Sequence, residues 1–359
     1  MHFKALPVKK GDAFYLHRII GEENNGKYKK ENSVQILFDA GVCANFVNTF
    51  KQNVKNNYVD VIVCSHSDSD HIFGVRKLME TGIKPCSELW VPAEWYLINK
   101  NLNPKLKRSY EDLISSLKER LDQYTEYEEG FSLFDAHGLS FIDRILKYDT
   151  SFFKKMKMYN ITNVIHMLIQ FEVISDIVNL AMNLGVICRW FNYVDSNPSG
   201  GEPFLEPINC EEFLSTQITK IKPKDLNNLN RKNKEALVFK SCLSNRALVI
   251  FSSDSNFNFS QPLPVGFSKE SILYTAPHHG SVNNANAYSR LDKITDKNSY
   301  CIRSHGSSKV GSSHINAQAQ KYCTQCNTMK GTTAKIVEAK LGVDMTWNLL
   351  SQTPICQCK

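Results

Sequence analysis

The sequence predicts a single α/β domain that spans residues 1–359. Two observations predict this class. First, short apolar runs of strand length recur along the chain, and amphipathic segments of helix length lie between some of them. Second, 42% of the residues are hydrophobic and 22% are charged, which is an ordinary composition for a globular protein with a sizeable core.

The apolar runs have the length and composition of β-strands. The first two, residues 13–20 and 33–41, flank a polar loop at residues 21–32. The next, residues 60–65, is rich in valine and isoleucine, which favour strands. The remaining expected strands are residues 87–93, 186–191, 235–241, 246–253, 271–277, 299–304 and 334–340.

Helical patterns occur between these strands. Residues 71–82 form one, and Gly82 suits the position just after a helix end. Residues 110–124 carry an apolar stripe, and a further helix is expected to end near Gly185. Because residues 98–183 are mainly helical and interrupt the strands, the sequence predicts a helical insertion there.

Charge and apolar stretches bear on location and partners. The net charge of +7 favours acidic partners only slightly. The most apolar segment, residues 163–188, is interrupted by Glu172 and Asp176, so we expect a buried helix and no membrane span. The opening residues lack the long apolar stretch of a secretory signal, and many of the 11 cysteines, such as Cys64, sit in apolar runs. These features predict a cytoplasmic protein with reduced thiols.

The stretch SHSDSDHIFGV begins at the last residue of the strand expected at residues 60–65. It delivers His66, Asp68, Asp70 and His71 within six residues. Carboxylates packed this closely repel each other unless a cation lies between them, and a mixture of imidazole and carboxylate suits Zn²⁺, Mn²⁺ or iron. The alternative is that an aspartate caps the next helix and the histidines are incidental.

Two later strands end in the same way. Residues 246–253 are followed by Asp254, and residues 271–277 by His278 and His279, then Gly280 and Ser281. Strand ends are where rigid scaffolds place functional side chains. The recurrence favours a metal site over incidental histidines.

These motifs resemble the metallo-β-lactamase fold, and within it the metallohydrolase domain of the ComEC/Rec2 competence proteins. SHSDSDHIFGV is similar to that branch's H-x-D-x-D-H signature, and PHHGS at residues 277–281 to another of its motifs. KKGDAFYL resembles its opening strand and LFDAG the end of the next one, while NKEALV resembles an N-x-x-S-L-V strand, with Ala236 where serine is usual. Asp254 matches the aspartate of a G-D pair in which Ser253 replaces the glycine. The resemblance implies an αββα sandwich.

The resemblance also implies one or two divalent ions per chain, most plausibly zinc or manganese, that activate a water molecule as nucleophile. It implies His66 and Asp68 on one ion, Asp70 and His71 on the other, Asp254 as a bridge, and His278 in preference to His279 on the second ion. Asp70 and His71 are the catalytic candidates, with His314 as a substrate contact or general acid. The expected supporting or substrate-contacting residues are Asp12, Asp39, Asn233, His279 and Ser281.

The chain departs from the family pattern in its histidines. No convincing match is found for the further ligand histidine of the broader superfamily, since His137 and His166 both lie in the insertion. His314 stands in a closing stretch that has Ile315 where proline is common, and His305 is a weaker candidate there. Ordinary loop histidines are the alternative for both.

The activity implied is phosphodiester hydrolysis, most plausibly as a nuclease on DNA. Lys105, Lys107 and Arg108 offer a patch for the DNA backbone, with a solvated helix face as the alternative. A second class is a weak or inactive metallohydrolase fold that serves as a binding or regulatory subunit of a larger assembly, with the insertion contacting the protein partner. A third is hydrolysis of a small ester or a cyclic nucleotide.

A separate cysteine pattern lies later in the chain. Cys323 and Cys326 form a C-x-x-C pair, and Cys356 and Cys358 form a C-x-C pair. Four thiolates suit a tetrahedral structural zinc ion, although C-x-C is not a usual half-site. Free thiols are the alternative.

Overall fold

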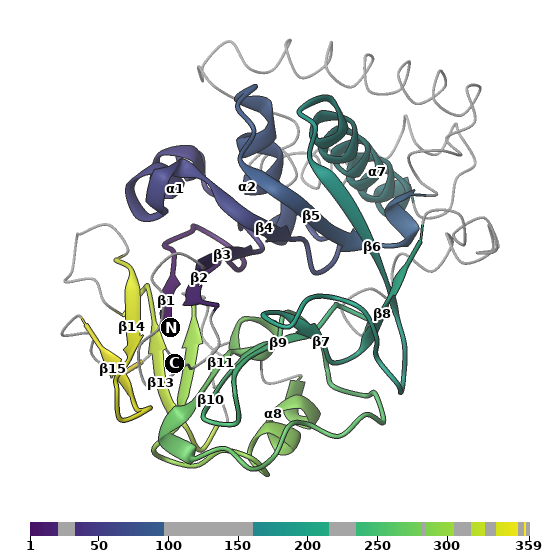
Figure 1. Cartoon of the computed structure of the whole chain (residues 1–359). Coiled ribbons are helices and arrows are strands. Elements are labelled where there is room, and N and C mark those ends of the chain that lie inside the picture. The colour runs from purple at the N-terminus through teal and green to yellow at the C-terminus, as the bar shows by residue number, and fades with distance from the viewer. Residues whose placement is uncertain are drawn as a thin grey trace.

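Two β-sheets pack face to face in the computed structural model (Figure 1). The structure describes residues 1–20, 33–96, 161–214, 235–281, 284–304, 317–326, 335–350 and 355–356. In these residues one sheet has nine strands and the other has six.

The nine-stranded sheet has the order β15-β14-β1-β2-β3-β4-β5-β6-β8. Its centre, from β3 to β6, is parallel, whereas the outer strands pair antiparallel. The parallel strands are rich in buried β-branched residues, as expected for strands covered on both faces. The strands are β1 (His2–Ala5), β2 (Phe14–Ile19), β3 (Ser33–Phe38), β4 (Val59–Val63), β5 (Cys86–Pro92), β6 (Ile187–Tyr193), β8 (Cys210–Phe213), β14 (Val337–Leu341) and β15 (Trp347–Leu349).

The six-stranded sheet has the order β13-β12-β11-β10-β9-β7. The strands from β10 to β13 are parallel, and β9 pairs antiparallel with β10. All five residues of β10 are buried, which places this strand in the middle of the layers. The strands are β7 (Glu206–Pro207), β9 (Phe239–Leu243), β10 (Ala247–Phe251), β11 (Ile272–Thr275), β12 (Tyr300–Arg303) and β13 (Gln320–Cys323).

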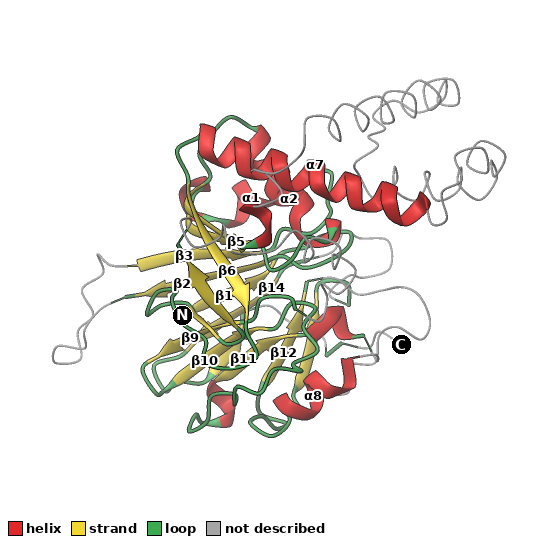
Figure 2. Ribbon diagram, turned by 90° about the vertical axis from the view of Figure 1, so that its right-hand side faces the viewer, coloured by secondary structure: helices red, strands yellow, loops and turns green. Residues whose placement is uncertain are grey.

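Helices cover the outer faces of both sheets (Figure 2). Three helices, α1 (Phe46–Asn53), α2 (Ser69–Glu80) and α7 (Ile161–Asn183), pack on the nine-stranded sheet. The shorter α8 (Ala285–Leu291) packs on the six-stranded sheet, and single 3-10 turns lie at Lys55–Asn57, Lys269–Ser271 and Pro277–Gly280. The result is an αββα sandwich, so the predicted fold class is confirmed.

Aromatic side chains fill the space between the sheets. Phe38 of the first sheet stacks on Phe251 of the second, with ring centroids 4.7 Å apart and planes within 7°. Phe239 contacts Phe38 and Trp90 from the same central layer. Each such ring buries a large apolar area, and this inner layer therefore fixes how the strand ends of the two sheets meet.

The expected insertion is described only in part. Residues 97–160 lie outside the described residues, including the helix expected at residues 110–124. The second half of α7 is not separate from the sandwich, because Ile174, Ile177 and Ala181 are buried in the core beneath it. Arg76 of α2 also forms an ion pair with Asp176 of α7 at 2.7 Å. Within the described ranges, no helix is sufficiently long and apolar to cross a membrane.

Candidate metal centre

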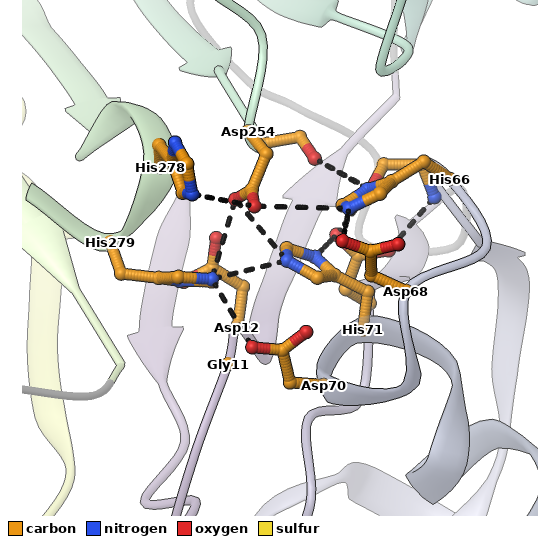
Figure 3. A network of polar contacts seen from close by, with 12 residues as sticks. Gly11, Asp12, His66, Asp68, Asp70, His71, Asp254, His278 and His279 are labelled. Atoms are coloured by element: carbon orange, nitrogen blue, oxygen red, sulfur yellow. Dashed lines mark hydrogen bonds and ion pairs between the residues drawn. The ribbon is translucent and has the colours of Figure 1, made fainter. Parts of the chain in front are cut away.

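Histidine and aspartate side chains meet where the two sheets present the ends of their parallel strands (Figure 3). His66, Asp68, Asp70 and His71 come from the connection between β4 and α2 and from the first turn of α2. Asp254 follows β10, and His278 and His279 follow β11. Asp12 stands just before β2. The loops are short, so the packing of the sheets positions all these side chains.

Asp254 lies at the middle of the cluster. Its Oδ1 atom is 3.2 Å from Nε2 of His71 and 3.3 Å from Nε2 of His279. Its Oδ2 atom is 3.8 Å from Nε2 of His66 and 3.5 Å from Nε2 of His278. The two oxygens of one buried carboxylate therefore face two different sets of imidazoles (Figure 3).

The ligand atoms form two groups that share Asp254. In the first group, His66 and Asp68 join Asp254, and His66 Nε2 lies 3.6 Å from Asp68 Oδ2. In the second group, Asp12, His71 and His279 join it. Within each group the ligand atoms lie within 4.8 Å of one another, a spacing that one ion can span.

Carboxylates hydrogen-bonded at Nδ1 fix the orientations of the two imidazole rings in the second group. His71 Nδ1 lies 2.8 Å from Asp39 Oδ2, and His279 Nδ1 lies 3.0 Å from Asp12 Oδ1. In each neutral ring Nδ1 then donates to the carboxylate, which leaves the lone pair of Nε2 pointing into the centre. These two Nε2 atoms are only 3.2 Å apart. Two lone pairs at this distance repel unless a proton or a cation lies between them.

Asp39 is itself held by a hydrogen-bond network. It accepts from the backbone N–H of Ser65 at 2.8 Å and from the hydroxyl of Ser65 at 2.7 Å. Ser253 in turn donates to the Ser65 hydroxyl at 2.6 Å. This chain of contacts crosses from one sheet to the other directly beneath His66 and His71, so it couples their positions.

Four non-glycine residues at the centre have a left-handed backbone. They are Asp39 at φ 55°, Ser253 at φ 47°, His278 at φ 47° and His279 at φ 53°. This conformation costs on the order of 1 kcal/mol for each residue, and such residues concentrate at functional sites. The surrounding packing holds these side chains in place against that cost.

Gly11 lets the loop before β2 approach the start of α2. A Cβ atom at this glycine would lie 1.5 Å from the carbonyl oxygen of Asp70. The backbone N–H of Asp12 donates to the same carbonyl at 3.3 Å. This close contact delivers the Asp12 carboxylate to His279.

The pKa values of the central histidines and of Asp254 are strongly shifted by their mutual contacts. Burial lowers the pKa of His279, but the carboxylates of Asp254 and Asp12 outweigh it and raise that pKa to about 9. Burial also opposes the charge on His71, yet Asp254 and Asp39 raise its pKa well above the ordinary value. For Asp254, burial favours the neutral acid, but the neighbouring imidazoles hold its pKa well below the usual range. Without a metal, protons on these rings balance the carboxylates.

Several buried atoms of the centre suit a divalent ion. Among the described residues, His66 Nε2 and Asp12 Oδ2 are buried side-chain atoms with no hydrogen-bond partner, although buried polar atoms normally have one. Imidazole nitrogen and carboxylate oxygen are donors that zinc and manganese accept. The two groups therefore fit a pair of divalent ions with Asp254 between them.

The structure places His278 and His279 on different oxygens of Asp254. His279, rather than His278, stands beside His71, while His278 faces the other oxygen of Asp254. Because both residues have left-handed backbones, their rings turn to different sides of the carboxylate. Asp12 contacts His279 at Nδ1, with Oδ1 at 3.0 Å, and its carboxylate also lies within 4.8 Å of the other ligand atoms of the second group.

The remaining expected residues fall into two sets. Asp70 is near the second group, with Oδ2 3.7 Å from His279 Nε2 and 3.5 Å from Lys10 Nζ. The backbone N–H of Ser281 donates to the carbonyl of His278 at 2.8 Å, which closes the turn. The other residues singled out in the sequence lie outside the described residues, as does the side chain of His166; they are Asn233, His137, His305, His314, Cys358, Lys105, Lys107 and Arg108.

Sequence reasoning missed Lys10 and the hydrogen-bonding role of Ser65 and Ser253. Ser65 and Ser253 each stand one position before a ligand residue, at the end of a buried strand, and that position was the available signal. Lys10 precedes Gly11, and no feature of its own marks it out.

Comparison with known proteins agrees with this geometry. No curated protein matches the chain significantly. Residues 33–138, however, match the family model of the metallo-beta-lactamase superfamily, and this range holds Asp39, His66, Asp68, Asp70 and His71. Members of this superfamily are usually metal-dependent hydrolases. The superfamily match over residues 33–138 thus covers part of a chain that has an αββα architecture and a His/Asp centre.

Proposed function

We propose that the chain is a metal-dependent phosphodiesterase that acts on DNA as a nuclease. The observation that carries the proposal is the position of Asp254, whose two oxygens face separate ligand groups. A carboxylate shared in this way is typical of two-metal sites, and such sites are widespread among phosphatases and nucleases. The resemblance of the H-x-D-x-D-H and PHHGS motifs to the ComEC/Rec2 branch supports a phosphodiester as the bond that is cleaved.

When bound, the two ions would lower the pKa of a water molecule and stabilise negative charge on a phosphoryl oxygen. The other tasks belong to side chains of the chain. Asp39 and Asp12 hold the rings of His71 and His279 in one tautomer and one orientation. Asp70 is 14% exposed and lies beside the second group, where its carboxylate can orient the attacking water and accept its proton.

Three side chains of the centre are accessible to a substrate. The side chains of His278 and Asp68 are each 31% exposed, whereas His71 and Asp254 are almost fully buried. Lys10, 59% exposed, stands at the same centre beside Asp70. A cationic amine and an accessible imidazole next to two ions form a surface to which a phosphate can bind.

The test compares wild type with Asp254→Asn, which keeps the shape of the side chain but removes its charge. The control is Asp344→Asn, because Asp344 is exposed and remote from the centre. Hydrolysis of single-stranded DNA, duplex DNA, RNA, a cyclic nucleotide and a chromogenic phosphodiester is measured with Mn²⁺, Mg²⁺ and Zn²⁺ added separately. We expect DNA cleavage to fall by at least about a hundredfold in Asp254→Asn and to be unchanged in the control.

The substrate panel also separates the other functions. Hydrolysis of only the cyclic nucleotide or the chromogenic ester would make the chain a small-molecule hydrolase. Bound metal without hydrolysis of any substrate would favour a recognition role in a larger assembly. Equal DNA cleavage by wild type and Asp254→Asn would show that the activity comes from a contaminant, and the proposal would be rejected.

A further inference from the structure

We propose that Cys323, Cys326 and Cys356 bind a structural zinc ion, at a site distinct from the His/Asp centre. These residues form a third group of metal-ligating side chains, with their sulfur atoms within 4.8 Å of one another. The proposal does not depend on the phosphodiesterase activity, because none of the three cysteines belongs to either His/Asp group.

The chain brings the three thiols together from two segments. Cys323 is the last residue of β13, and Cys326 follows in the turn after that strand. The backbone N–H of Cys356 donates to the carbonyl of Lys321 at 2.7 Å, which anchors the third cysteine beside the same strand. Backbone hydrogen bonding therefore places Cys356 next to a C-x-x-C pair, which is a common zinc half-site.

The sulfur separations match a tetrahedral ion. Cys356 Sγ lies 3.5 Å from Cys323 Sγ and 3.9 Å from Cys326 Sγ. Zinc–sulfur bonds of about 2.3 Å in tetrahedral geometry place neighbouring sulfur atoms about 3.8 Å apart. The observed separations fall on both sides of this value, and both are far longer than the ~2.05 Å of a disulfide bond.

Two N–H donors point at sulfur atoms of this group. The backbone N–H of Cys326 donates to Cys323 Sγ at 3.2 Å, so the peptide dipole points at that sulfur. Arg303, whose side chain is fully buried, donates from Nη2 to Cys356 Sγ at 3.4 Å. A guanidinium remains charged even when buried, and an anionic cluster of three thiolates around a divalent ion balances that charge.

Arg303 also connects this group to the His/Asp centre. Its Nη1 atom donates to the backbone carbonyl of His279 at 3.0 Å. One buried side chain thus contacts a cysteine of the third group and the backbone of a ligand in the second. An ion on the cysteines would hold Arg303, and through it the turn that carries His279, in a fixed position.

The test uses cobalt as a probe of the full-length protein, reduced and freed of metal before Co²⁺ is added. Sulfur-to-cobalt charge transfer gives a near-ultraviolet absorption band that imidazole and carboxylate ligands do not give, so cobalt in the His/Asp centre does not interfere. We expect wild type to show the band, and Zn²⁺ in excess over all three groups to abolish it because zinc binds thiolates more tightly. Cys323→Ser, Cys326→Ser and Cys356→Ser should each weaken it strongly.

Two controls keep the test specific. Cys43→Ser removes a partly buried thiol that is not in the group, and it should leave the band unchanged. Cys358→Ser should leave a band as well, since the three cysteines named above suffice for binding. The absence of any band in reduced wild type, or its survival in the triple serine variant, would overturn the proposal.

A second measurement covers the case in which the serine variants fail to fold. Wild-type protein is alkylated with and without prior chelation, and the modified cysteines are identified by mass spectrometry. We expect Cys323, Cys326 and Cys356 to be protected before chelation and modified after it. A disulfide between any two of them in freshly purified protein, or equal modification with and without chelator, would also overturn the proposal.

Discussion

Nε2 of His71 and Nε2 of His279 face each other 3.2 Å apart, although the two residues are 208 positions apart in the sequence. Each ring is anchored at Nδ1 by a carboxylate, Asp39 for one and Asp12 for the other. Neither ring can therefore turn its lone pair away without breaking a buried hydrogen bond. The pair must share a proton or a cation, and which of the two it holds depends on pH and on metal concentration.

The first prediction concerns this competition. The folded-state pKa of His279 is about 9, above the unfolded value of about 6.5. Its protonation therefore stabilises the metal-free protein fully below about pH 6.5, and this stabilisation is lost as the pH rises through about 9. Metal affinity should change in the opposite direction over this range, because metal binding must displace the protons.

Two measurements check this prediction. Urea unfolding of the chelated protein should give a midpoint that falls between about pH 6.5 and about pH 9. Calorimetric titration with Mn²⁺ in buffers of different ionisation enthalpy should show release of about one to two protons per chain near neutral pH. Metal affinity that does not vary with pH would contradict the opposed rings as ligands.

The second prediction concerns the shared carboxylate. Asp254→Ala should abolish binding in both His/Asp groups, whereas His66→Ala should affect only the first and His279→Ala only the second. Manganese is the suitable ion because it prefers oxygen and nitrogen donors and avoids the cysteine group. Paramagnetic resonance titration should show about two ions in wild type, about one in each histidine variant and none in Asp254→Ala. Wild-type stoichiometry in Asp254→Ala would rule out the bridge.

The third prediction concerns the support of His71. Asp39→Asn keeps the size of the side chain but removes the charge that orients the ring, and we expect the affinity of the second group for Mn²⁺ to fall by about 10- to 100-fold. Binding to the first group should change much less. Asp344→Asn is the control at an exposed position and should leave both affinities unaltered. Equal weakening of both groups would instead indicate a general loss of structure.

The fourth prediction concerns Gly11, which has φ +87° and no room for a Cβ atom. Gly266 has a similar φ of +92°, but a Cβ atom there would meet nothing within 4 Å. Gly266→Ala should therefore lower the free energy of unfolding by only the backbone cost, about 1 to 2 kcal/mol. Gly11→Ala should lower it further and also weaken metal binding, because Asp12 must move away from His279.

Denaturant midpoints and Mn²⁺ affinity of the two alanine variants provide the comparison. The difference between them isolates the clash with Asp70, since the backbone cost is common to both. If the two variants lose the same stability and both bind metal normally, the close contact at Gly11 does not position Asp12.

The cluster after β4 could be read from sequence because it is local. Its four ligand-type residues lie within six positions, directly behind a run of buried β-branched residues. Asp254 could be inferred as well, because its strand is uniformly apolar and the acid follows just two serines after the strand ends. In both places a pattern of neighbours in sequence suffices, and no knowledge of long-range packing is needed.

The placement of His278 and His279 could not be read in this way. A strand-like alternation gives no account of two successive left-handed residues, and that backbone alone decides which ring meets His71. The short strand β1 was missed for a related reason. It has only four residues, and its identity as a strand rests on pairing with β14, where His2 lies opposite Lys340.

The division of the ligands between the two sheets has a consequence for how slowly the protein unfolds. His66, Asp68 and His71 are carried by the nine-stranded sheet, and Asp254 and His279 by the six-stranded one. Neither sheet alone presents a complete group, so an ion can be captured only after the distant halves of the chain have docked. Contacts made this late contribute little to the rate of folding and mainly slow the reverse step. Bound ions would therefore crosslink the two sheets, and they would slow unfolding far more than they speed folding.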